Sequence, residues 1–97
     1  MGLEVVVART APCPLGSLLD RLKADGITAT LAMVDGVLQG PGATPPAAWR
    51  DARLRTPAGM VALRRASAGI VVVVFGNADA ALQALQRRIA DTLRQLP

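Results

Sequence analysis

The sequence predicts one domain of the α/β (α+β) class, with a single β-sheet of about five to six strands and two helices. Short β-branched apolar runs and segments of helical periodicity follow one another in the order β-α-β-β-β-β-β-α. Ninety-seven residues suit one domain, which we assign to residues 1–97. Apolar residues make up 52% of the chain and charged residues 19%, which is typical of a globular fold.

An apolar strand and an amphipathic helix are expected first. Leu3–Ala8 holds three consecutive valines, which favour a strand buried on both faces. Four leucines then follow at i, i+3, i+4 and i+7, and this stripe predicts a helix over about residues 15–25. They are Leu15, Leu18, Leu19 and Leu22. Gly26 is placed as the C′ cap of this helix.

Residues 27–39 predict a β-hairpin. Apolar and polar residues alternate from Ile27 to Val34, as in a half-buried strand. The pair Asp35-Gly36 then separates two apolar runs, which is typical of a two-residue hairpin turn.

Residues 40–48 form a connection without a long regular element. Their three prolines and two glycines exclude a continuous helix or strand. Pro45 or Pro46 is expected to open one short helical turn that runs through Trp49 and Asp51.

An antiparallel meander of three strands is expected next, over residues 53–55, 60–64 and 70–75. The first two strands are joined by Thr56-Pro57-Ala58-Gly59, which fits a type I turn. Ile70–Phe75 is apolar at every position and should be the most buried strand.

A long amphipathic helix is predicted over residues 78–95. Asn77 is expected to be its N-cap, with Asp79 near the positive end of the helix dipole. Its apolar stripe consists of Leu82, Leu85, Ile89, Leu93 and Leu96. Because the preceding strand is apolar on both faces, the two helices lie either on one face with a partner subunit opposite, or one on each face.

The composition excludes several kinds of function. The net charge is +4, but the arginines are dispersed and no aromatic residues alternate with them, so we expect no nucleic-acid binding. The chain has no histidine and one cysteine, and its carboxylates are scattered, so we expect no metal site, no cofactor and no acid–base pair. The start lacks a basic signal-peptide region, and the longest apolar run is too short to span a bilayer. We therefore expect a cytoplasmic protein.

A few residues remain as candidates for interaction. Trp49 follows the proline-rich stretch, where we interpret it as an anchor at the edge of the core that also touches a partner. The pairs Arg64-Arg65 and Arg87-Arg88 are candidate contacts for a protein with an acidic surface. A solvated surface is the other interpretation of these pairs.

The side chain best suited to act as a nucleophile is that of Cys13. It lies between a predicted strand and the start of a helix, where the helix dipole lowers a thiol pKa. The alternative is an ordinary buried residue in a proline-rich turn.

Residues 15–96 resemble a shortened Roadblock/dynein light-chain domain. The matching segments are the helix LGSLLDRLKAD, the hairpin ITATLAMVDGVLQG, the strands RLRT, GMVALRR and GIVVVVFG, and the last helix NADAALQALQRRIADTL. The family's middle helix is nearly absent, replaced by ATPPAAWRDA, and the strand Leu3–Ala8 is additional. The resemblance implies a non-enzymatic homodimeric scaffold that regulates a small Ras-like GTPase or a motor.

The chain is also similar to the thioredoxin fold. VVVARTAPCP resembles a glutaredoxin-like start with Cys13 at the redox position, and Thr56-Pro57 resembles the cis-proline segment. Gly16 stands where the second cysteine would be, so the resemblance implies at most a monothiol protein. It further implies a depressed thiol pKa and a central Leu3–Ala8 strand parallel to its neighbour. An edge position for that strand favours the Roadblock-like interpretation.

Overall fold

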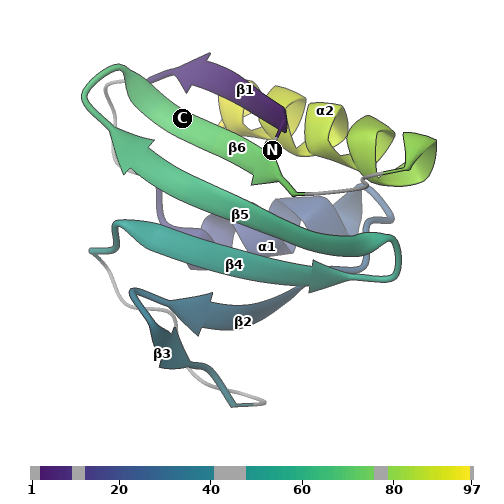
Figure 1. Cartoon of the computed structure of the whole chain (residues 1–97), viewed down its shortest axis with the longest axis horizontal. Coiled ribbons are helices and arrows are strands. Elements are labelled where there is room, and N and C mark those ends of the chain that lie inside the picture. Colours follow the sequence, from purple (N-terminus) through teal and green to yellow (C-terminus); the bar gives the residue numbers. More distant parts are fainter. Residues whose placement is uncertain (1–2, 10–12, 41–47, 76–78, 97) are drawn as a thin grey trace.

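A computed structural model describes residues 3–9, 13–40, 48–75 and 79–96. In this part of the chain, one sheet of six strands packs against two helices (Figure 1). The strands are β1 (Leu3–Ala8), β2 (Thr30–Val34), β3 (Val37–Leu38), β4 (Asp51–Thr56), β5 (Gly59–Ala66) and β6 (Gly69–Val74). The helices are α1 (Leu15–Ala24) and α2 (Ala80–Gln95). The fold class and the order of the elements confirm the prediction.

Every pair of neighbouring strands is antiparallel, in the spatial order β1-β6-β5-β4-β2-β3. The meander from β4 to β6 forms the middle of the sheet, because two-residue turns return the chain directly beside itself. The hairpin of β2 and β3 extends the sheet beyond β4, because β2 pairs with β4. The first strand of the chain, β1, completes the other side by pairing with the last strand, β6.

The position of β1 corrects one expectation. The run of valines predicted a strand buried on both faces, but Val7 is the one β1 residue that is fully buried. Val6, by contrast, is 53% exposed. The physical reason is that both helices lie on one face of the sheet, so Val7 contacts the helix layer while Val6, on the other face, has no covering layer.

Both helices lie on the same face of the sheet, which is one of the two arrangements that the sequence left open (Figure 1). The helix α2 packs on β1 and β6, and α1 lies beside it. The Arg9 guanidinium donates hydrogen bonds to the carbonyl groups of Leu93 and Leu96, at 3.0 and 2.9 Å. These bonds satisfy carbonyls at the end of α2 that have no partner within the helix.

The core lies between the helices and this face of the sheet. It combines the leucine stripe of α1 with the apolar side of α2 and with alternate residues of the strands. Its fully buried members include Leu15, Leu18, Leu22, Ile89, Leu93, Val7, Leu54, Leu63, Val61, Val72 and Val74. The core is thus aliphatic.

The C-terminal end of α1 agrees with the prediction, but the N-terminal end of α2 differs from it. Gly26 has a φ of +79°, a left-handed conformation that suits glycine after the end of α1. For α2 the N-cap is Asp79, whose carboxylate accepts a 2.9 Å hydrogen bond from the Leu82 N–H. The predicted N-cap, Asn77, lies outside the described residues. Asp79 takes the role because its side chain reaches the free N–H of the first turn.

The strand boundaries also differ in detail. In the hairpin, β2 begins at Thr30 rather than Ile27, while Asp35 and Gly36 have φ of +50° and +81°. Positive φ at both positions is the geometry of the expected two-residue turn. The predicted helical turn through Trp49 is wrong over residues 48–51, because Asp51 already begins β4. Its first part, at residues 45–47, lies outside the described residues.

Candidate functional site

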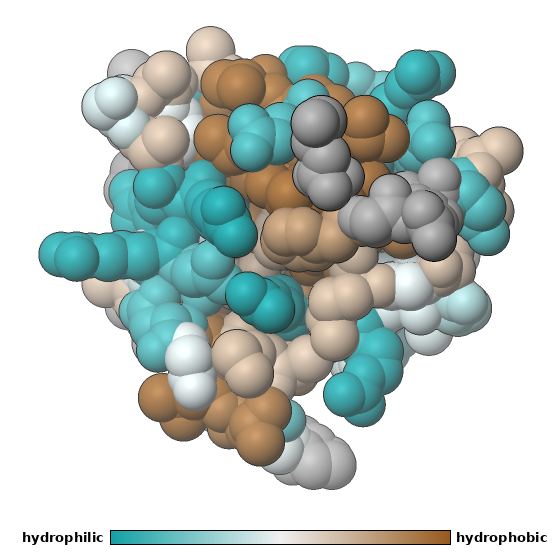
Figure 2. Space-filling view, in the orientation of Figure 1, coloured by the Kyte–Doolittle hydropathy of each residue, from teal (hydrophilic) through white to brown (hydrophobic). Residues whose placement is uncertain are grey.

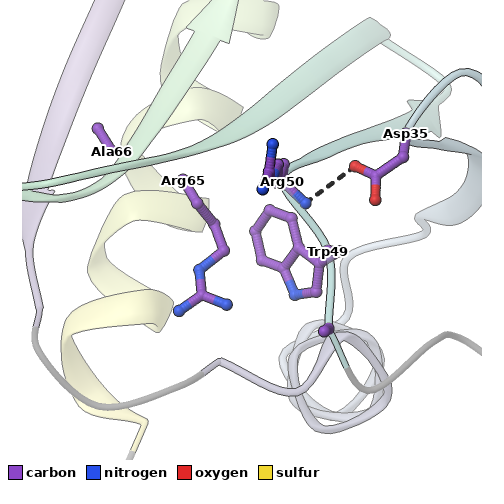
Figure 3. A pocket seen from close by; sticks show the side chains of 6 residues that line it. Asp35, Trp49, Arg50, Arg65 and Ala66 are labelled. Carbon is purple, nitrogen blue, oxygen red and sulfur yellow. Dashed lines mark hydrogen bonds between the residues drawn. The ribbon is translucent and has the colours of Figure 1, made fainter.

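A hollow of about 430 Å³ lies where the β2–β3 turn approaches the end of β5 (Figure 3). Its lining residues come from three separate parts of the chain. They are Asp35, Ala48, Trp49, Arg50, Arg65 and Ala66. Two of them, Trp49 and Arg65, are residues that the sequence marked as interface candidates.

The Trp49 indole forms one wall of the hollow. It is only 2% exposed, and its Nε1–H donates a 2.9 Å hydrogen bond to the Cys13 carbonyl group. The Arg65 guanidinium lies 5.9 Å from the centroid of the ring, within the range of a cation–π interaction. Trp49 therefore anchors the start of β4 to the segment that precedes α1, as expected, and it leaves little of its own surface for a partner.

Asp35 forms the opposite rim. One of its carboxylate oxygens accepts hydrogen bonds from the backbone N–H groups of Arg50 and Asp51, both at 2.9 Å. These two bonds hold the pKa of the Asp35 carboxyl below its usual value, because they stabilise the charged form. The carboxylate thus fastens the hairpin turn to β4, which is a structural role.

The chemistry of this hollow is limited. Arg50 and Arg65 make it positively charged, and the Asp35 carboxylate is already engaged with the backbone. Among the described lining residues there is no nucleophile with an adjacent base. Within the described ranges, no group of three or more His, Cys, Asp and Glu residues lies close enough to hold a metal ion.

Cys13 lies behind Trp49 and is 3% exposed. Burial raises the pKa of its thiol, although the positive charges of Arg9 and Arg65 act in the opposite direction. The thioredoxin resemblance implied a depressed thiol pKa, a central parallel first strand and a cis bond before Pro57. The structure has an antiparallel edge strand and a trans bond at that proline.

The two arginine pairs are not brought together. Arg64 and Arg65 point to opposite faces, as neighbours in a strand do, so Arg65 reaches Trp49 while Arg64 pairs with Asp51 at 3.3 Å. On α2, Arg88 donates a 3.2 Å hydrogen bond to the Asp25 carbonyl group at the end of α1. Arg87 is exposed on the helix layer.

In the described part of the chain, the face of the sheet opposite the helices has no covering layer (Figure 1 and Figure 2). We call the part of it on β1, β6, β5 and β4 the open face. Thr30 and Met33 of β2 continue it beyond Arg55 and Arg53. The side chains of the open face come from alternate positions of four strands and from the residue after β6. They are Glu4, Val6, Asp51, Arg53, Arg55, Met60, Ala62, Arg64, Val71, Val73 and Phe75. In Figure 2 hydrophobic surface gathers in the upper part of this view, where β1 and β6 lie.

A cluster on the open face was missed by the sequence analysis. The guanidinium groups of Arg53 and Arg64 each lie 5.9 Å from the centroid of the Phe75 ring. Beneath this cluster, Ala62 and Val73 are 0% and 3% exposed, although neither belongs to the core on the helix side. The available signal was the alternation of Val71, Val73 and Phe75, which places three apolar side chains on one face.

A smaller apolar patch lies at the other edge of the sheet. Val37 and Leu38 of β3 are 63% and 76% exposed. Figure 2 shows a second hydrophobic area at the bottom of the view, where β3 lies. None of the described helices is both long enough and apolar enough to cross a membrane.

Comparisons of the chain with protein-family models, with curated proteins and with solved structures found no significant match. The residues and geometry described above are therefore the basis for any functional assignment.

Proposed function

We propose that this chain is a non-catalytic regulatory or scaffold domain that acts through protein–protein interaction as a homodimer, with the open face as its dimer surface. The observation that carries the proposal is the position of both helices on one face of the sheet, although strand β6 is apolar on both faces. On the open face, Val6, Met60 and Phe75 are 53%, 37% and 42% exposed. Exposed apolar side chains that lie together on one face are typical of an interaction site, whereas single ones scattered over a surface are not.

The energetics favour burial of this face. Each Å² of apolar surface removed from water stabilises an assembly by about 25 cal/mol. A domain of under a hundred residues buries a modest share of its surface on folding, so it gains much from a second copy. An isologous contact satisfies this need with one surface, because the same patch serves on both subunits.

The position of β1 supports the Roadblock-like interpretation over the thioredoxin-like one. We expected an edge strand for the first and a central parallel strand for the second, and β1 lies at the edge. The Roadblock-like interpretation implies that the dimer regulates a small Ras-like GTPase or a motor. In that arrangement the exposed Arg87, on the helix layer, stays available to an acidic partner while the open face is occupied, and Arg88 lies beside it with one nitrogen bonded to the Asp25 carbonyl group.

Sedimentation velocity from low to high micromolar concentration tests the proposal. We expect a reversible monomer–dimer equilibrium. A chain that remains monomeric over the whole range would contradict it.

A matched pair of variants then locates the surface. Met60→Lys on the open face should raise the dissociation constant by roughly tenfold or more, since it places a charge in an apolar contact. Val37→Lys is the control, because Val37 is also an exposed apolar residue but lies on β3, outside the open face. Equal effects of the two variants would argue against the open face.

A further inference from the structure

We infer that the two copies meet in one register, in which Glu4 of each subunit faces Arg53 of the other about a two-fold axis parallel to the strands. This inference rests on the proposed homodimer and adds the recognition element that fixes how the copies meet. It follows from the order of four side chains across the open face.

These four side chains form one row across four strands. Glu4 of β1 pairs with Val73 of β6, Val73 pairs with Ala62 of β5, and Ala62 pairs with Arg53 of β4. Directly paired residues of antiparallel strands point to the same face. The row therefore runs from an acid, through two small apolar residues, to a base.

The basic end of the row carries more positive charge than its neighbours neutralise. The Asp51 carboxylate is shared, with one oxygen 3.7 Å from Arg53 Nε and the other 3.3 Å from Arg64 Nε. One carboxylate thus serves two guanidinium groups. Arg53 Nε is also buried without a hydrogen-bond partner in the described part of the chain, since 3.7 Å is too long for such a bond.

The acidic end of the row lacks a positively charged partner among the described residues. Glu4 is exposed on the edge strand β1, and among the described residues no ion pair or hydrogen bond engages its carboxylate. The open face therefore presents an unpaired acid at one edge and surplus positive charge three strands away, on the same row.

A two-fold axis midway between β5 and β6 brings these two ends together. Strands lie about 4.8 Å apart, so the backbone positions of Glu4 and Arg53 are each roughly 7 Å from such an axis, on opposite sides. From there the Arg53 side chain extends toward the Phe75 ring. Rotation places Glu4 opposite the partner's Arg53, and Val73 opposite the partner's Ala62. Phe75 lies two residues beyond Val73 and Met60 two before Ala62, so these side chains also approach each other across the axis. Two stacked sheets pack in this manner about 10 Å apart.

Charge reversal tests the register. Glu4→Arg places two arginines opposite each other at both ends of the dimer, and Arg53→Glu places two glutamates there. We expect each variant alone to raise the dissociation constant roughly a hundredfold or more, since like charges in contact repel each other. Mixed together, the two variants should form a heterodimer of near wild-type affinity, because both contacts then join opposite charges.

Two controls make the result specific. Arg87→Glu makes the same charge change on the helix layer and should leave the wild-type equilibrium unchanged. Arg55→Glu lies on the same strand and face as Arg53, one row along, and its mixture with Glu4→Arg should not restore the dimer. Circular dichroism checks that each variant folds. If Arg53→Glu does not fold, Arg53→Gln replaces it, and its mixture with Glu4→Arg should still favour the heterodimer.

The outcomes separate this inference from the proposed function. A monomeric wild-type chain would overturn both. A dimeric wild-type chain whose Glu4→Arg and Arg53→Glu variants remain dimeric would overturn the register and leave the homodimer intact. Rescue by Arg55→Glu in place of Arg53→Glu would also overturn this register.

Discussion

Gln86 of α2 donates a 2.9 Å hydrogen bond from its side-chain amide to the Val72 carbonyl group of β6, inside the protein. The same amide nitrogen donates a second 2.9 Å bond to the Leu3 carbonyl group of β1. Gln86 is 3% exposed. It was not selected from the sequence as a buried polar residue, because it lies among the leucines and isoleucine of the helix. A single polar side chain thus ties the last helix to both the first and the last strand.

Replacing Gln86 with Leu should destabilise the fold by about 1–3 kcal/mol, because two buried carbonyl groups lose a donor. Urea unfolding followed by circular dichroism measures the change. Arg87→Leu is the matched control, since it changes an exposed position of the same helix to a residue of similar helix propensity and should alter stability little. Equal stability of the Gln86 variant and wild type would show that these bonds contribute nothing net.

The Asp35 carboxylate predicts a pH dependence with a definite sign. Its folded-state pKa is lowered by the backbone N–H groups of Asp51 and Arg50. The charged carboxylate is therefore stabilised more in the folded state than in the unfolded state. This contribution is present above the unfolded pKa of about 3.9 and is lost as the pH falls through the lower folded value. The midpoint of thermal unfolding of Asp35→Asn should lie below that of wild type at neutral pH, with a gap that closes in acid.

Asn at position 35 retains a side-chain acceptor and tolerates the positive φ, so the comparison isolates the charge. Asp20→Asn, on the exposed side of α1, is the control and should show no such closing gap. A gap at position 35 that stays constant with pH would contradict the assignment.

Two glycines are expected to respond to alanine in opposite directions. At Gly69, with φ of +141°, a Cβ would overlap the Val7 carbonyl oxygen and lie 2.7 Å from the Arg9 nitrogen, both in backbone. Gly69→Ala should therefore cost about 2 kcal/mol or more and loosen β1 from β6. At Gly16 in α1 nothing lies within 4 Å of the added atom, so Gly16→Ala should stabilise by about 0.5–1 kcal/mol. Chemical denaturation of both variants measures the two shifts, and a change of the same sign in both would contradict the geometry.

The Cys13 thiol should react slowly in the folded protein. It is 3% exposed and its pKa is raised, so little thiolate is present or accessible near neutral pH. A disulfide reagent should label it at least about tenfold more slowly in buffer than in denaturant. The control is the double variant Cys13→Ser/Ser17→Cys, whose one cysteine lies at an exposed position of α1 and should react freely. Labelling of Cys13 as fast as this control would revive the monothiol hypothesis.

Much of the fold follows from local pattern. The leucine spacing of Leu15 to Leu22 sets the first helix, and Asp35-Gly36 sets the hairpin turn, because both signals act over a few neighbouring residues. The candidate site was predicted only in part. Trp49 and Arg65 were chosen on residue type, and the structure joins them at one hollow. Glu4, Arg53 and Phe75 were passed over, because nothing within their own segments shows which strands lie between them.

The sequence by itself determined the number, type and order of the elements, since hydrophobic period, caps and turn residues are local properties of the chain. The tertiary structure alone decided that β1 pairs with β6 at an edge and that both helices lie on one face. These choices depend on pairings such as Leu3 with Val74, which join the two ends of the chain. Such pairings depend on the packing of all elements together, and that packing leaves one face of the sheet uncovered and aligns Glu4 with Arg53 across it.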